Sequence, residues 1–134
     1  MIYSAGNRGT EEMTEILAVG AGGFAGAVLR YLIGLIPLSE SFIFPIKTFS
    51  INIAGCIAIG IIAAALSRNH SINPQMLLFL KVGLCGGFTT FSTFALESAA
   101  LLKSGHPVTA LLYILLSLLA GVAVIFAVEY VSGK

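Results

Sequence analysis

The sequence predicts an all-α membrane protein with four transmembrane helices, the third of which is broken at mid-membrane. Hydrophobic residues make up 57% of the 134 residues, charged residues only 10%, and the mean hydropathy is +1.00. Soluble domains carry about 25% charged residues, so a chain this apolar requires lipid around it. Four apolar segments each reach the ~20 residues that a spanning helix needs; they cover 16–36, 46–66, 74–102 and 107–131.

The whole chain, 1–134, is predicted to form one integral membrane domain in a lipid bilayer, with a polar, frayed N-terminal tail over 1–13. Glu11, Glu12 and Glu15 precede the first segment, where a cleavable signal peptide would carry basic residues instead. We therefore expect this segment to stay in the membrane. The net charge of +1 gives no indication of a nucleic-acid partner.

The first segment is rich in glycine. Gly22 and Gly26 form a small-xxx-small pair, which allows two helix backbones to approach closely. We expect this pair to serve packing rather than ligand binding. Arg30 is the deepest strong base of the segment. Its side chain either snorkels to the interface or makes one vestibule of a pore electropositive.

The second segment contains a polar residue well inside the hydrocarbon, Asn52. Its amide needs partners, which are either on another helix or in a water- or ion-filled path. Thr48 lies one turn earlier on the same helical face. Cys56 and Cys85 also lie inside apolar segments, and we interpret both as small packing residues.

The third segment contains the string GGFTTFSTF at 86–94, in which glycines, hydroxyl and β-branched residues disfavour a regular helix. A break at this depth cannot face lipid, because hydrocarbon offers no hydrogen-bond partners. It must therefore be buried in protein, line a polar cavity or hold an ion. Backbone carbonyls freed around Gly86 and Thr89 would suit a hard cation.

Side chains beyond the break are candidates for contact with an anion. The rings of Phe91 and Phe94 project from one side of the continuing helix, and a ring edge is weakly positive; the alternative is that both rings only pack. Glu97, about one turn further on, lies either on the pathway or in a vestibule. Lys81, in the first half of the segment, has the same two interpretations as Arg30.

Hydroxyl groups continue into the fourth segment. Tyr113 and Ser117 are spaced i, i+4 and share a face. With Ser92 and Thr93 they could form a row of neutral donors. A lone serine in a membrane helix, however, usually bonds to its own i−4 carbonyl.

Charge counting does not fix an orientation, because lysines and arginines divide almost evenly between the two sides. Either a weak bias still selects one topology, or copies insert both ways and pair antiparallel about a two-fold axis in the membrane plane. Four close-packed helices leave no evident lumen, which favours a path made by two chains.

The sequence resembles the Fluc or CrcB family of fluoride channels over roughly 22–121. The specific part of the resemblance is GGFTTFSTF at 86–94 with Glu97 behind it. Weaker matches are GGxxGAxxRY at 22–31, Asn52-x-x-Gly55 and Tyr113-x-x-x-Ser117.

The resemblance implies a fluoride-selective ion channel that lets fluoride leave the cell passively and so protects against its toxicity. It implies a dual-topology, antiparallel homodimer with two pores, multi-pass in the bacterial inner membrane, and no enzyme activity. A structural sodium ion at the dimer interface would bind the backbone carbonyls of Gly86 and Thr89 from each copy. Vestibule residues would be Arg30 and Glu97. The anion pathway would use Asn52, Phe91, Phe94, Ser92, Thr93, Thr48, Tyr113 and Ser117.

Two other functions fit the sequence less well. A four-helix drug–proton antiporter needs a carboxylate deep in the membrane and tryptophans that stack on cations. The first segment has only Glu15 at its start, and the chain has no tryptophan. A structural membrane subunit without transport would not require a broken helix.

Overall fold

The computed structural model describes residues 3–37, 43–69 and 71–132. Within these ranges all regular elements are helical, and four stretches are long and apolar enough to cross a membrane. The prediction of an all-helical protein with four spanning segments is therefore confirmed. The four stretches are Arg8–Gly34, Ile46–Arg68, Pro74–Lys103 and Pro107–Ser132.

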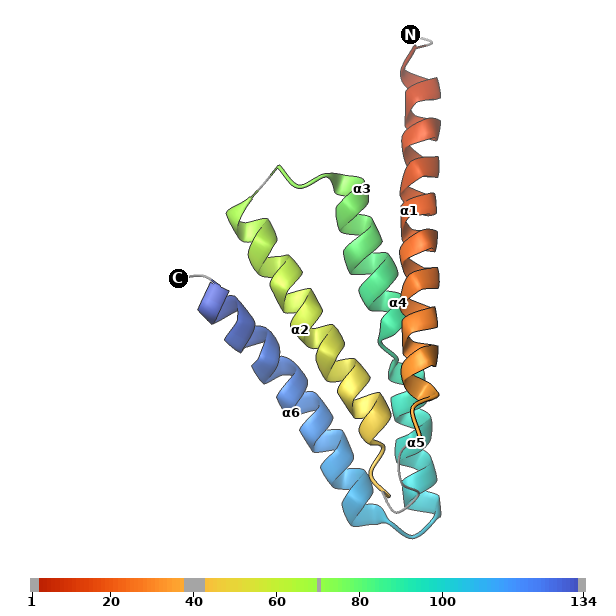
Figure 1. Ribbon diagram of the computed structural model, residues 1–134, viewed down its shortest axis with the longest axis vertical. Coiled ribbons are helices and arrows are strands. Elements are labelled where there is room, and N and C mark those ends of the chain that lie inside the picture. Colours follow the sequence, from red (N-terminus) through yellow and green to blue (C-terminus); the bar gives the residue numbers. More distant parts are fainter. Residues whose placement is uncertain (1–2, 38–42, 70, 133–134) are drawn as a thin grey trace.

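Helix α1 (Tyr3–Gly34) is longer than the sequence predicted. The expected tail over 1–13 is helical from Tyr3 onward, and residues 1 and 2 lie outside the described ranges. Glutamate and methionine are good helix formers, and a helix already nucleated in the apolar segment propagates through them. The 32 residues span about 48 Å, more than a ~30 Å hydrocarbon core. Figure 1 shows the N-terminal end of α1 extending past the other helices.

The third span consists of several helical pieces. It starts at Pro74, as predicted. The Asn73 side chain caps this start, because it accepts hydrogen bonds from the Gln75 and Met76 N–H groups at 2.8 and 3.2 Å. A π-helix follows, and such segments occur frequently at functional sites. The pieces are α3 (Pro74–Leu77), the π-helix η1 (Leu78–Cys85), α4 (Gly86–Phe88) and α5 (Phe91–Lys103).

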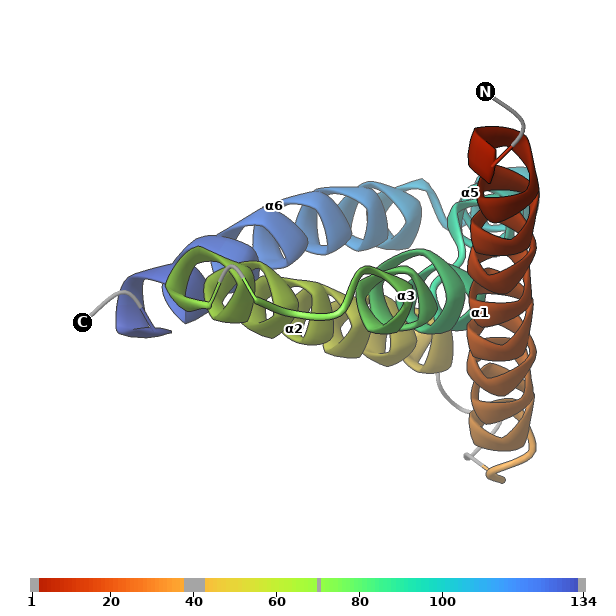
Figure 2. The same ribbon diagram turned by 90° about the horizontal axis from the view of Figure 1, so that it is seen from above.

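The helices alternate in direction and pack as two pairs (Figure 1). Helix α1 packs along η1 and α4, whereas α2 (Ile46–Arg68) packs along α6 (Pro107–Ser132). Figure 2 shows α1 and α6 on opposite sides of the molecule, and their described residues make no contact. The third span, as the inner member of its pair, also contacts α2 and α6. The chain is therefore an open arrangement rather than a closed four-helix bundle.

Glycines allow the backbone of α1 to approach those of η1 and α4 unusually closely, as the small-xxx-small pair predicted. A Cβ on Gly26 would lie 2.7 Å from Phe88 N, and one on Gly83 would lie 2.7 Å from Val19 O. A Cβ on Gly22 would collide with the Phe79 carbonyl. Such close approach requires residues without side chains on both helices.

Most of the apolar surface faces outward. At most 22% of the most apolar window of any span is buried within the chain, in α2. In a membrane protein this surface is covered by lipid or by another chain. The main buried cluster lies where α5 meets α6. It contains Leu101, Ala110 and Tyr113, with Phe44, Phe49 and Phe94 packed against them.

Candidate ion pathway

The third span is interrupted at Thr89 and Thr90, near the middle of its 30 residues. Both threonines are extended, with φ/ψ of −81°/162° and −151°/117°, a conformation that suits β-branched side chains. Helix α5 restarts at Phe91. Thr90 is its N-cap, because the Thr90 hydroxyl accepts a hydrogen bond from Thr93 N–H at 3.2 Å.

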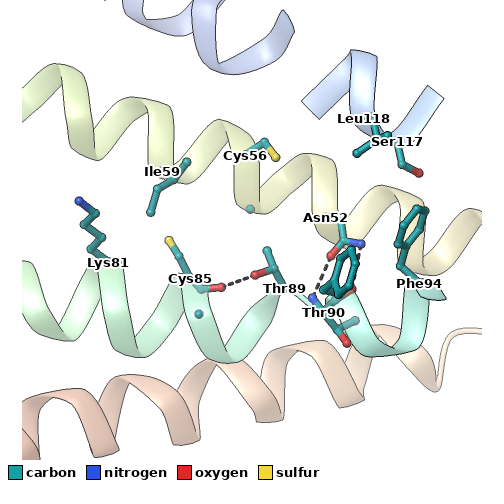
Figure 3. Close-up of a pocket in the computed structure, with 13 residues that line it drawn as sticks. Asn52, Cys56, Ile59, Lys81, Cys85, Thr89, Thr90, Phe94, Ser117 and Leu118 are labelled. Atoms are coloured by element: carbon teal, nitrogen blue, oxygen red, sulfur yellow. Dashed lines mark hydrogen bonds between the residues drawn. The ribbon is translucent and has the colours of Figure 1, made fainter. Parts of the chain in front are cut away.

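Asn52 of α2 holds the interrupted backbone. Its Oδ1 accepts a hydrogen bond from Thr90 N–H at 2.9 Å, and its Nδ2 donates to the Thr90 carbonyl at 3.2 Å (Figure 3). The carboxamide thus binds one residue at both of its backbone groups, as a neighbouring strand would. Of the two partners expected for this amide, the structure shows the one on another helix. Nδ2 still carries a second hydrogen for a ligand.

These contacts divert the donors that two carbonyls would use in a continuous helix. The Gly86 carbonyl would accept from Thr90 N–H, which is bonded to Asn52 instead. The Thr89 carbonyl would accept from Thr93 N–H, which is bonded to the Thr90 hydroxyl. Gly86 and Thr89 are therefore the carbonyls whose regular helical donors are engaged elsewhere. Unwound carbonyls of this kind coordinate Na⁺ in transporters.

Arg30 of α1 also binds the interrupted segment. Its Nε donates to the Gly87 carbonyl at 3.2 Å. This carbonyl belongs to the last turn of α4, where unsatisfied C=O groups carry partial negative charge. The sequence predicted either snorkelling or a vestibule position for Arg30, and did not predict this contact with the break.

Glu97 of α5 has a hydrogen-bond donor on each carboxylate oxygen. The Thr48 hydroxyl donates to Oε1 at 2.8 Å, and the Tyr113 hydroxyl donates to Oε2 at 2.8 Å. Tyr113 is fully buried and Thr48 is 6% exposed. The three residues come from α2, α5 and α6, so this carboxylate cluster (Thr48, Glu97, Tyr113) ties three spans together.

A groove of about 390 Å³ lies beside the break, between η1, α2, α5 and α6 (Figure 3). Phe91 lines the groove and is 78% exposed, and its ring centroid is 5.9 Å from that of Phe94. The Ser117 hydroxyl is buried and has no hydrogen-bond partner among the described residues. The residues that line the groove are Asn52, Gly55, Cys56, Ile59, Lys81, Cys85, Gly86, Thr89, Thr90, Phe91, Phe94, Ser117 and Leu118.

Comparison with known proteins assigns the chain to a family. A family model described as CrcB-like protein, Camphor Resistance (CrcB), matches residues 17–128. The chain belongs to the CrcB family.

Several relatives, each named fluoride-specific ion channel FluC, cover most of this CrcB chain. The protein from Phocaeicola vulgatus is 47% identical over 111 residues, 82% of this chain and 91% of that protein. The protein from Chlorobaculum tepidum is 43% identical over 116 residues, 86% and 91% of the two chains. The protein from Azobacteroides pseudotrichonymphae is 40% identical over 114 residues, 84% and 91%. The resemblance to this family noted in the sequence is thereby confirmed.

The structure separates the predicted site residues of this CrcB chain into two places. Asn52, Phe91, Phe94 and Ser117 line the groove, together with Gly86 and Thr89. Thr48, Tyr113 and Glu97 form the carboxylate cluster and do not line the groove. Phe94 connects the two, because its ring packs on Tyr113 with centroids 5.0 Å apart.

Two of the predicted hydroxyl groups lie in the first turn of α5 instead of the groove. The Thr93 hydroxyl accepts a hydrogen bond from the Thr90 hydroxyl at 3.0 Å, and the Ser92 hydroxyl is 3.5 Å from that same group. In this single chain the predicted row of hydroxyls is therefore not continuous. Ser117 departs from the usual behaviour of serine in a membrane helix, since its hydroxyl forms no bond to the i−4 carbonyl.

Sequence reasoning did not single out Thr90. Its N–H, carbonyl and hydroxyl are all engaged in hydrogen bonds that define the break. The available signal was the pair of adjacent β-branched threonines directly after two glycines.

Proposed function

We propose that this CrcB-family chain forms a fluoride-selective channel through which fluoride leaves the cell passively. It is a transport protein of the cell membrane rather than an enzyme. Two copies inserted in opposite orientations make an antiparallel homodimer with two pores, and the break lies about halfway across the bilayer. The printed name shared by relatives that cover most of the chain supports fluoride as the transported ion.

The observation that carries the proposal is the unpartnered Ser117 hydroxyl in a groove that also presents the Asn52 amide and the phenylalanine rings. An unsatisfied buried hydroxyl costs about 1–3 kcal/mol, which a bound hydrogen-bond acceptor would recover. Fluoride is small and strongly hydrated, so a path for it must replace water with several donors. Hydroxyl, amide and ring-edge hydrogens do this without the trapping that a full positive charge at contact distance would cause.

The dimer is supported by the incompleteness of the single chain. Phe91 lines the groove and is nevertheless 78% exposed in the single chain. An isologous contact would cover this face with the same face of a second copy. Inverted repeats produce the same arrangement within single-chain transporters, with the ion site at the repeat interface.

The residues present also fit a sodium ion. The carbonyl oxygens of Gly86 and Thr89 are hard donors, and their regular helical partners are engaged elsewhere. One chain offers two such oxygens, and its symmetry mate would supply two more. When bound, the cation would offset part of the cost of dehydrating fluoride nearby.

The function is tested with purified protein in liposomes loaded with potassium fluoride or potassium chloride. After valinomycin is added, an ion-selective electrode measures the anion released. We expect rapid release of fluoride and retention of chloride. Liposomes that retain fluoride would overturn the proposed channel.

Two variants test the ring contacts. Phe91→Ile and Phe94→Ile should slow fluoride release at least tenfold while the dimer still elutes normally from a sizing column. The matched control is Phe24→Ile, because Phe24 of α1 is 74% exposed, similar to Phe91, and does not line the groove. Wild-type rates in both variants would show that the rings only pack.

The dual topology is tested with a protease-cleavable tag at the C-terminus. In sealed membrane vesicles, about half of the tags should be cleaved from outside. Cleavage of all tags or of none would rule out the antiparallel dimer without affecting the flux result.

A further inference from the structure

Among the residues that the structure describes, the basic side chain on the wall of the candidate pathway is Lys81 rather than Arg30. Lys81 lies in η1 and lines the groove with Cys85, Gly86 and Thr89 (Figure 3). Arg30 does not line the groove, and its Nε is bound to the Gly87 carbonyl.

We propose that the Lys81 ammonium attracts fluoride into the groove and raises its concentration next to the ring and hydroxyl donors. This inference rests on the proposed fluoride channel and assigns a residue role within it. The ammonium acts at a distance, as a cation in the approach to the path. Neutral donors of the groove make the contacts at the narrow part.

The position of Lys81 along the span supports this role. It lies in the apolar stretch Pro74–Lys103, between the capped start at Asn73 and the break at Thr89. A lysine inside a membrane span is costly, and such residues generally face a protein interior or a water-filled cavity. The groove provides that cavity.

The carboxylate of Glu97, the acidic residue predicted near the path, is hydrogen-bonded outside the groove. Glu97 accepts hydrogen bonds from Thr48 and Tyr113, and none of these three residues lines the groove. Among the described residues, the groove wall therefore carries a positive charge and no acidic side chain. A cleft of one sign with low-dielectric walls concentrates ions of the opposite sign.

The proposed two-fold axis also places the Lys81 ammonium near the path of the second copy. Lys81 and Phe94 are equally far along the sequence from the midpoint between Gly86 and Thr89. If the axis passes through that midpoint, Lys81 of one copy lies at about the depth of the partner's Phe94. Each path would then have ring edges from one copy and an ammonium group from the other.

A charge series at position 81 tests the proposal in the fluoride-release assay. Two unit charges in water attract each other by about 1 kcal/mol at about 4 Å and by less at longer range, so removing the Lys81 charge from a water-filled groove should slow initial release by about threefold, and more if the groove excludes water. We expect Lys81→Arg to stay within twofold of wild type, Lys81→Gln to be at least threefold slower, and Lys81→Glu slower again. The same three substitutions at Lys103, which ends α5 outside the groove, should leave the rate unchanged.

The outcomes separate this role from its alternatives. Each variant is first checked for an intact dimer on a sizing column. A Lys81→Gln rate equal to wild type would overturn the role of Lys81 and leave the channel intact. Equal losses in Lys81→Arg and Lys81→Gln would show a packing role and also overturn it. Wild-type liposomes that release no fluoride would overturn the proposed function itself, and this inference with it.

Discussion

The close contact between α1 and the third span predicts opposite effects for two neighbouring glycine substitutions. Gly26 faces α4, so its added Cβ would lie 2.7 Å from Phe88 N and 3.1 Å from Gly87 C, and would collide with the Leu84 carbonyl. An added Cβ on Gly23 meets nothing within 4 Å. Both positions are in the interior of α1. The helix preference for alanine over glycine is therefore common to Gly26→Ala and Gly23→Ala, and only the packing differs.

The expected sizes follow from these distances. Contacts of a real Cβ rarely fall below 3.4 Å, so the contact with Phe88 N alone would require the Gly26→Ala methyl group to push the two backbones apart by about 0.7 Å, and the collision with the Leu84 carbonyl requires more. Overpacking of this kind costs about 1–3 kcal/mol, and displacement of α4 adds to it because Arg30 and Asn52 hold the break at fixed distances. The higher helix propensity of alanine over glycine stabilises both variants by about 1 kcal/mol. We expect Gly26→Ala to lose about 1–2 kcal/mol and Gly23→Ala to gain up to about 1 kcal/mol.

Thermal unfolding of the detergent-solubilised protein, at one fixed heating rate, measures both effects. Cys85 is only 6% exposed and ends η1 next to α4, so in a Cys56→Ser background its labelling by a thiol-reactive dye reports the loss of this packing. The melting temperature should fall by several degrees in Gly26→Ala and stay level or rise in Gly23→Ala. A Gly26→Ala protein as stable as wild type would refute the close contact. Equal losses in both variants would refute the assignment of the contact to the Gly26 face.

Three further substitutions test individual contacts of the break and groove. Asn52→Ala leaves both backbone groups of Thr90 unpaired. The same assay should show a loss of about 2–4 kcal/mol in the free energy of unfolding, and fluoride release should stop. A variant as stable as wild type would contradict the two hydrogen bonds. Arg30→Met removes the donor to the Gly87 carbonyl and should cost about 1–3 kcal/mol; an unchanged melting temperature would contradict that contact. Ser117→Ala removes an unpartnered hydroxyl, so stability should stay level or rise while fluoride release slows, and a coupled loss of both would indicate a structural serine instead.

The architecture could be predicted because a bilayer restricts what a sequence can do. A span needs a fixed length of apolar residues, so its limits can be read from where polar residues and prolines begin. The observed α2 and α6 end within two residues of the predicted segments. The start of α1 was predicted wrongly because this rule describes only the part of a helix inside the bilayer. Outside it, helix propensity decides, and residues 3–13 continue the helix.

The string at 86–94 predicted that the helix breaks, whereas its exact hydrogen bonds could not be predicted. They depend on partners from other spans, namely Asn52 on α2 and Arg30 on α1. A single sequence does not state which faces of those helices meet the third span. The π-helical register of η1 adds to this, because the α-helical period predicts a shared face for Lys81 and Cys85 but not for Lys81 and Gly86, which are five residues apart and line the same groove.

The same contacts explain how a break in apolar surroundings can be stable and still leave ligands for an ion. Each donor that a regular helix would give to Gly86 or Thr89 is taken by a side chain: Asn52 takes Thr90 N–H, and the Thr90 hydroxyl takes Thr93 N–H. These two donors are thus satisfied while the two carbonyls keep free acceptor capacity, which favours a cation at the backbone. The Asn52 amide that frees the Gly86 carbonyl also lines the groove proposed for the anion. Substitution of this one residue should therefore impair a cation site and an anion path together, whereas Ser117→Ala should affect the anion path alone.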